Sequence, residues 1–251
     1  DYNYRAIYVT AAGVGSVVDV QALQSFSDFD GSMTNGSSRF SLLQPSNGGT
    51  ILLPTSESAS WMIERVQVVL DGTGTLNTSR LTSINGSVIL VSGGVTVTLP
   101  GVTSYTNTST RNGEYRYLRA TGAGSVLSLP NLVTITNGTH NDTNLRIEAL
   151  AGGRIEMPAV TTIQDGSGGD YNYRAIYVTS SGVGSVVDLS AMQAFSDGYG
   201  SLADTNSARF SLLQASASGT ILLPTLANAS WAIDRVQLVL DGTGTLNTSR
   251  L

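Results

Sequence analysis

Apolar and polar residues alternate along most of this chain, and turn-forming segments interrupt the alternation at regular intervals. The pattern is clearest in GAGSVLSLPNLVTITNG (122–138) and AGGRIEMPAVTTIQDG (151–166). In both, a glycine corner is followed by an alternating stretch ending at Leu-Pro or Met-Pro, and then by a shorter apolar stretch ending at Asn-Gly or Asp-Gly. Another alternating stretch precedes each glycine corner. This period of two, rich in β-branched residues, predicts three β-strands per template.

The template recurs along the chain and places one kind of residue at each corner. Glycine permits tight corners, proline interrupts a strand ladder, and Asn or Asp tolerates left-handed dihedral angles. The glycine column comprises Gly15, Gly49, Gly74, Gly94, Gly124, Gly153, Gly184, Gly219 and Gly244. The proline column comprises Pro54, Pro100, Pro130, Pro158 and Pro224. The third column comprises Asp28, Asn85, Asn107, Asn137 and Asp165.

The chain also repeats at a larger scale. Residues 1–81 recur as 170–251 with the same start, DYNYRAIYVT, and the same end, VLDGTGTLNTSRL. Six templates separate Gly15 from Gly184, which gives a period of about 28 residues, within the range of solenoid repeats. We therefore divide the chain into a first unit, 1–169, and the start of a second unit, 170–251.

These features predict an all-β fold, a parallel β-solenoid of about nine coils with about 28 residues in each. Residues of one column would stack about 4.8 Å apart, so that Val, Ile and Leu form one continuous core. We expect one continuous solenoid over residues 1–251, and the pattern leaves its handedness open. Neither end of the sequence shows a polar capping coil, so we expect end-to-end association with adjacent repeats or with copies of the chain.

The composition and charge of the chain disfavour several classes of function. The chain has 251 residues, a net charge of −5, a pI near 4.7 and no cysteine. The negative charge disfavours nucleic acid as a partner, because phosphates require a basic surface. No apolar run approaches the roughly 18 residues of a membrane span, so we expect no membrane insertion of this segment. We also expect no cofactor.

Two acidic clusters are candidates for chemistry. Glu156 and Asp188 fall in the same outward column of adjacent coils, hence about 5 Å apart, which is the separation used by retaining glycosidases. No other catalytic group accompanies them in the pattern, so we interpret them as surface carboxylates and expect no enzymatic activity. Asp28 and Asp30 resemble the start of a calcium-binding loop, but the second copy has lost the second acid, which argues against a metal site.

Other candidate residues lie in polar segments. His140 is the only histidine and stands in a polar loop, so we interpret it as a loop residue rather than a catalytic one. Tyr2, Tyr4, Tyr8, Tyr115 and Tyr117, with Arg5, Arg116 and Arg119, form either an aromatic–guanidinium strip for a sugar or partner, or packing at strand ends. Candidate N-glycosylation sites are Asn35, Asn77, Asn85, Asn107, Asn137, Asn141, Asn228 and Asn247.

The repeated GxGS-apolar-x-apolar-Pro segment, with the apolar-x-Thr-apolar step after it, resembles the β-strand repeats of long, adhesin-like β-solenoid proteins of microbial cell surfaces. The two segments 122–135 and 152–163 carry this resemblance. It implies export, a stiff extracellular rod or filament, and a role in attachment or in a surface coat, with a glycan or cell-surface receptor as a further partner. The alternative is a glycan-binding or glycan-cleaving β-helix that acts from its loop edge.

Overall fold

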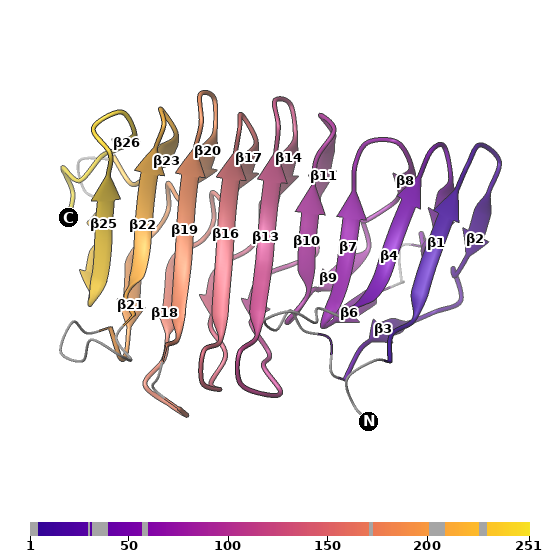
Figure 1. The fold of residues 1–251 in the computed structure, drawn as a ribbon, viewed down its shortest axis with the longest axis horizontal. Coiled ribbons are helices and arrows are strands. Elements are labelled where there is room, and N and C mark those ends of the chain that lie inside the picture. The colour runs from indigo at the N-terminus through magenta and orange to yellow at the C-terminus, as the bar shows by residue number, and fades with distance from the viewer. Residues whose placement is uncertain are drawn as a thin grey trace.

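The structure, a computed structural model, describes residues 5–29, 31, 40–56, 60–170, 173–200, 209–225 and 230–251. In this part of the chain every regular element is a β-strand, and no helix is long and apolar enough to cross a membrane. The strands stack in parallel as a solenoid, which confirms the predicted fold class. Figure 1 shows the largest sheet face on, with β1 and β25 at opposite ends of the rod.

The strands before the glycine corners form one long sheet. It comprises β1 (Tyr8–Ala12), β4 (Ser41–Ser46), β7 (Val66–Leu70), β10 (Val88–Val91), β13 (Tyr115–Thr121), β16 (Asn144–Leu150), β19 (Ala175–Ser181), β22 (Ser211–Ser216) and β25 (Val236–Leu240). Nine strands define nine coils, numbered here from coil 1 at β1 to coil 9 at β25. Tyr8 in β1 and its counterpart Tyr177 in β19 are 169 residues and six coils apart, so a coil averages about 28 residues, as predicted.

The strands after the glycine corners form two short sheets, one behind the other along the rod. The first comprises β2 (Val17–Asp19), β5 (Thr50–Leu52) and β8 (Thr75–Leu76). The second comprises β11 (Thr96–Thr98), β14 (Val126–Ser128), β17 (Arg154–Glu156), β20 (Val186–Asp188), β23 (Thr220–Leu222) and β26 (Thr245–Leu246).

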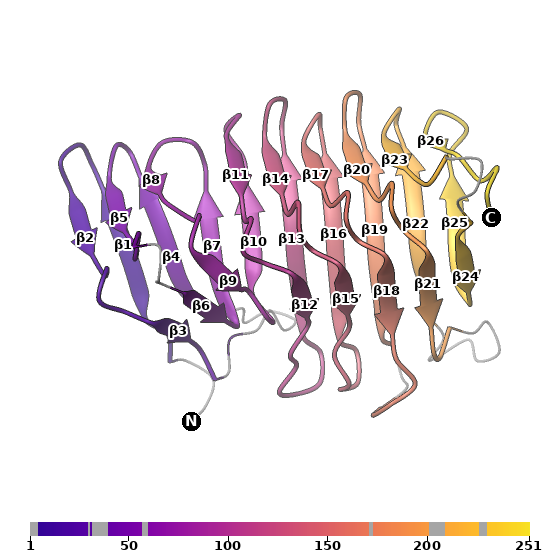
Figure 2. The same ribbon diagram turned by 180° about the vertical axis from the view of Figure 1, so that it is seen from behind.

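The third strands of the coils are divided in the same way, as the view from behind shows (Figure 2). One sheet comprises β3 (Ser25–Ser27), β6 (Trp61–Glu64) and β9 (Leu81–Ser83). The other comprises β12 (Ser104–Thr106), β15 (Thr134–Thr136), β18 (Thr162–Asp165), β21 (Ala194–Asp197) and β24 (Ala232–Asp234). Both divisions fall between coils 3 and 4, where only the long sheet continues, and we call this place the interruption.

The core lies inside the three walls of the solenoid. Inward residues at alternate positions are buried, as at Leu118 and Ala120 in β13 and at Ile147 and Ala149 in β16. These pairs lie in register on adjacent strands, so each coil covers the apolar side chains of its neighbours. Burial of one such side chain contributes about 1.5–3 kcal/mol relative to its exposure, which a single coil could not achieve alone.

The glycine column has two physical causes. Gly124 has φ +78°, a conformation that side-chain-bearing residues rarely adopt. Gly153 has no such dihedral angle, but a Cβ there would overlap the carbonyl oxygen of Ala120 in the preceding coil. Glycine is required at one corner by backbone conformation and at the other by the close stacking of coils.

Pro45 lies within β4 and not at a corner. Strand β4 pairs with β1 through Ser46, but it pairs with β7 only over Ser41–Leu43. Ala215 replaces Pro45 in the second copy, and there the pairing of β22 with β25 extends over Ser211–Ala215. Because proline has no N–H to donate, it shortens the ladder on one side of β4.

Candidate functional site

The loops that follow the third strands lie along one edge of the rod, which we call the third-corner edge. The Asn and Asp column stands at its base. Asn107 Nδ2 donates to Asn137 Oδ1 at 2.8 Å, and Asn137 Nδ2 donates to Asp165 Oδ2 at 2.9 Å. All three residues are buried. The column therefore joins coils 4, 5 and 6 by side-chain hydrogen bonds in addition to the backbone ladders.

Arg174 closes this column at coil 6. Its Nε donates to Asp165 Oδ1 at 3.1 Å, its Nη2 pairs with the same oxygen, and its Nη1 donates to the carbonyl oxygens of Gly168 and Asp170 at 2.5 and 2.9 Å. Both side chains are almost fully buried. Burial raises the pKa of Asp165, and hydrogen bonds from Arg174 and Asn137 oppose that change.

Asp28 has a structural role at the corner of coil 1. Its Oδ2 accepts hydrogen bonds from Ser41 N and Ser41 Oγ, both at 2.8 Å. Asp197 binds Ser211 in the same way in the second copy, at 2.8 and 2.7 Å. The carboxylate thus fixes the start of the next long strand in both copies. Asp30, its partner in the calcium hypothesis, lies outside the described residues.

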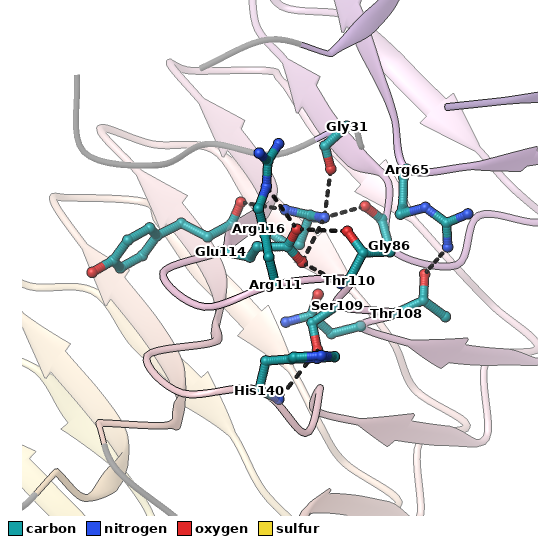
Figure 3. A network of polar contacts seen from close by, with 12 residues as sticks. Gly31, Arg65, Gly86, Thr108, Ser109, Thr110, Arg111, Glu114, Arg116 and His140 are labelled. Atoms are coloured by element: carbon teal, nitrogen blue, oxygen red, sulfur yellow. Dashed lines mark hydrogen bonds and ion pairs between the residues drawn. The ribbon is translucent and has the colours of Figure 1, made fainter. Parts of the chain in front are cut away.

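A buried ion pair, Arg116 with Glu114, forms the centre of the third-corner edge (Figure 3). Arg116 Nη2 lies 3.3 Å from Glu114 Oε2, and both residues are fully buried. Arg116 also donates to the carbonyl oxygens of Gly86 at 2.5 Å and Gly31 at 2.6 Å. Its guanidinium lies 5.1 Å from the centre of the Phe40 ring. We call these five residues the Arg116 cluster.

The remaining polar groups of Glu114 are also paired. Thr110 donates to the carboxylate from its N, at 3.0 Å, and from its Oγ1, at 3.1 Å. Burial lowers the pKa of Arg116, and the charge of Glu114 opposes that change. A buried charge pair of this kind is tolerated only when its hydrogen-bonding groups are satisfied.

The Arg116 cluster spans the interruption. Gly31 and Phe40 belong to the connection between coils 1 and 2, and Gly86 follows the third strand of coil 3. Arg116 is the second residue of β13, the long strand of coil 5. Arg65 of coil 2 adds a contact across the same place, because its Nη1 donates to Thr108 Oγ1 at 3.3 Å. Side chains thus connect coils 1–3 with coils 4–5 where two of the three walls are divided.

For the tyrosines and arginines that the sequence left open between an exposed strip and strand-end packing, the structure separates Arg116 from the others, and Tyr2 and Tyr4 lie outside the described residues. Arg116 points into the edge and is buried, so it belongs to no exposed strip. Tyr117, Arg119, Arg146 and Tyr177 instead share the outer face of the long sheet. Arg119 lies 4.4 Å from the Tyr117 ring centre and Arg146 lies 4.8 Å from that of Tyr177.

Two carboxylates extend this surface, which we call the Tyr–Arg face. Arg119 pairs with Glu148 at 2.5 Å, and Arg146 lies 3.8 Å from the same carboxylate. Nearer the third-corner edge, Tyr115 donates to Asp142 Oδ2 at 2.8 Å. The resulting surface offers aromatic rings and guanidinium groups on a flat sheet over coils 5–7.

The structure places Glu156 and Asp188 opposite each other on β17 and β20, as predicted. Each carboxylate has a local partner: Arg154 Nε lies 3.3 Å from Glu156 Oε1, and Ser190 N donates to Asp188 Oδ1 at 2.9 Å. In the described part of the chain, no group of three or more His, Asp or Glu side chains could hold a metal ion. These contacts explain both carboxylates as parts of the outer surface.

His140 has a neighbour that the sequence did not indicate. Its Nδ1 lies 2.9 Å from Ser109 Oγ across adjacent loops. The same Ser109 oxygen accepts the N–H groups of Thr139 at 3.2 Å and His140 at 3.4 Å. Because two backbone donors occupy this oxygen, Ser109 holds the loop rather than presenting a nucleophile.

The candidate glycosylation sites differ in access. Asn107 and Asn137 are buried and use their Nδ2 groups in the column, so glycosylation of the folded chain at these two positions is excluded by their burial. Asn85 and Asn141 are partly buried, whereas Asn77 and Asn247 are exposed. Asn35 and Asn228 lie outside the described residues.

Comparison of the chain with models of protein families, with curated proteins and with solved structures finds no match in any of the three.

Proposed function

We propose that this chain is a structural segment of an extracellular rod or filament on a microbial cell, extended end to end by adjacent repeats or by copies of itself. The observation that carries the proposal is the continuity of the solenoid across the boundary between the two repeat units. Strand β19, in the second unit, pairs with β16, in the first, over Ala175–Ser181.

The second unit packs on the first as one coil packs on the next. Ile176, near the start of the second unit, is fully buried beneath coil 6. Tandem units that stack in this way extend a rod without any change of fold.

The mechanical role follows from the bonding of the walls. Nine strands hydrogen-bond in one parallel sheet along the whole rod, and one apolar core runs beside it. Bending or stretching the rod would break several backbone hydrogen bonds at once, each worth about 0.5–1.5 kcal/mol net. The resemblance to surface β-strand repeats supports the extracellular setting.

Electron microscopy of the native material, scored for particle length, tests this proposal. We expect filaments far longer than the roughly 40–45 Å of nine stacked coils. Discrete particles of about that length would contradict a structural filament.

The Tyr–Arg face favours a second candidate function, the binding of an acidic glycan. Tyrosine rings stack on sugar rings, and guanidinium groups bind carboxylates or sulfates. Binding of acidic oligosaccharides that weakens with Tyr117→Ala, but not with Tyr199→Ala at the edge, would support it. Equal binding by both variants and the parent chain would exclude this face.

A further inference from the structure

We propose that the interruption is a hinge at which the rod bends, with the long sheet as its axis and Thr78 as the side chain that holds it closed. The hinge lets coils 1–3 tilt against coils 4–9 as two stiff bodies. This inference goes beyond the proposed function and does not rest on it, because the tilt is a property of a single chain.

The pairing of strands is weakest at the interruption. Between coils 5 and 6, β13 pairs with β16 over seven residues, β14 with β17 over three, and β15 with β18 over three. Between coils 3 and 4, β7 pairs with β10 over four residues, and no strand pairing of the described chain joins the other two walls (Figure 2). Each backbone hydrogen bond contributes about 0.5–1.5 kcal/mol net. Resistance to bending away from the long sheet is therefore lowest here.

Contacts beside the long sheet define the axis of the hinge. The Arg116 cluster joins the two sides of the interruption at the third-corner edge. At the glycine corner, Ser92 N donates to the carbonyl oxygen of Leu70 at 2.8 Å, and a Cβ on Gly93 would overlap the carbonyl oxygen of Asp71. Both ends of the long strands are thus held. A tilt therefore opens the second and third walls, and it opens them most at the proline corner between them.

Side chains of coil 3 close the two divided walls. Where the second wall meets the proline corner, Thr78 Oγ1 donates to the carbonyl oxygen of Thr98 at 2.9 Å. In the third wall, Thr106 N donates to Asn85 Oδ1 at 2.8 Å, and Gly86 N donates to the carbonyl oxygen of Thr106 at 2.8 Å. The contacts of Asn85 and Gly86 lie beside the third-corner edge, close to the axis. Thr78 lies further from the axis and therefore opposes a tilt most effectively.

The core is incompletely packed behind the divided walls. A cavity of about 10 Å³ lies between Leu76 and Leu81 of coil 3 and Val97 and Leu99 of coil 4. Trp61 of coil 2 also lines this cavity. A void removes partner atoms from its lining, so closing the walls gains less dispersion energy here than in a filled core. An opening tilt costs correspondingly less.

Distances between paired spin labels test the hinge, since the chain has no cysteine of its own. One chain carries Met62→Cys and Thr162→Cys, in the third strands of coils 2 and 6, on opposite sides of the interruption. The control chain carries Ser104→Cys and Ala232→Cys, in coils 4 and 8, where the third wall is continuous. Both pairs lie four coils apart, about 19 Å. We expect a distance distribution about one and a half times as broad, or broader, for the pair across the interruption.

Two variants should open the hinge. Thr78→Val removes the hydroxyl and keeps the shape of the side chain. It should lengthen the distance across the interruption by about 2 Å, which is a tilt of about 10° over the roughly 10 Å between facing walls. Gly101→Ala should act in the same direction, because its Cβ would lie 2.7 Å from the carbonyl oxygen of Leu81 in coil 3. The distance in the control pair should not change in either variant.

Asn131→Ala is the matched control variant. Asn131 Nδ2 donates to the carbonyl oxygen of Pro100 at 2.8 Å, so the change removes a similar hydrogen bond between coils 4 and 5, where all three walls are continuous. It should leave both distances unchanged.

Two results would overturn the inference. One is a distribution across the interruption that is no broader than that of the control pair. The other is lengthening by Thr78→Val and Gly101→Ala that does not exceed lengthening by Asn131→Ala. Both measurements use dilute single chains, so they are separate from the particle lengths that test the proposed function.

Discussion

Replacing Arg116 with methionine tests whether the Arg116 cluster holds the rod together at the interruption. The change removes the donors to the carbonyl oxygens of Gly31 and Gly86 and leaves the Glu114 carboxylate buried without its closest cation. Breaking a buried ion pair by removing one partner costs about 3–5 kcal/mol. We therefore expect the free energy of unfolding of the N-terminal coils to fall by about that amount.

The two tryptophans provide separate probes of the two copies. Trp61 is buried in coil 2 and Trp231 in coil 8. In a Trp231→Phe background, urea unfolding followed by fluorescence reports on the N-terminal coils, and a Trp61→Phe background reports on the C-terminal coils. Because each coil of a solenoid contacts mainly its neighbours, the Arg116→Met change should shift the Trp61 transition more than the Trp231 transition.

Two matched variants make the result interpretable. Arg119→Met, on the outer side of the same strand, breaks a pair whose arginine is one-third exposed and leaves Arg146 beside the buried Glu148 carboxylate, so it should cost only about 1 kcal/mol. Adding Glu114→Gln to Arg116→Met removes the unpaired charge and should recover about 1–3 kcal/mol. The reasoning would be refuted by an Arg116→Met cost no larger than that of Arg119→Met.

Three further changes follow from the fold. Pro45→Ala should extend the β4–β7 ladder to the length of the β22–β25 ladder in the second copy, and should therefore slow amide exchange at residues 69–70. Unchanged amide exchange there would contradict the role assigned to the missing N–H of Pro45. Gly93→Ala should lower stability in thermal unfolding more than Gly15→Ala does. Both glycines have a positive φ, which costs an alanine about 1–2 kcal/mol, but only at Gly93 would the added Cβ overlap a carbonyl oxygen, that of Asp71. The hydrogen bond from the Thr73 side chain lowers the pKa of Asp71 below 3.8, because it stabilises the carboxylate in the folded state. The turn therefore loses stability as the pH falls through that lowered pKa. Thr73→Val should raise the carboxyl pKa in an NMR titration, and an unchanged midpoint would exclude this cause.

The strands and corners could be predicted because each coil repeats the same physical requirements. An inward position must be apolar in every coil, and a corner that approaches the preceding backbone must be glycine in every coil. Residues such as Leu127 and Ile155 therefore show the fold through repetition alone. The register of Glu156 with Asp188 followed from the same argument.

The contacts at the third-corner edge could not be derived in this way. Arg116 has the same parity as the inward residues Leu118 and Ala120, which indicates that it points inside, but the pattern does not identify its partners. The carbonyl oxygen of Gly31 comes from a connection 85 residues away. Any residue supplies a carbonyl oxygen, so no side-chain pattern marks this acceptor. The division of two walls between coils 3 and 4 was likewise not predicted from the repeated pattern.

Fibre diffraction from oriented native material tests the central claim, that this chain represents part of a rod extended in the register of its own repeat. The account predicts a spacing of about 4.8 Å along the fibre axis and a longer axial period of about 29 Å, the height of the six coils in one unit. A longer period of about 43 Å, the height of nine coils, would indicate that whole chains stack as separate subunits and would contradict extension by adjacent repeats. Material that forms no oriented fibres, with discrete particles of nine-coil length, would contradict the structural function itself.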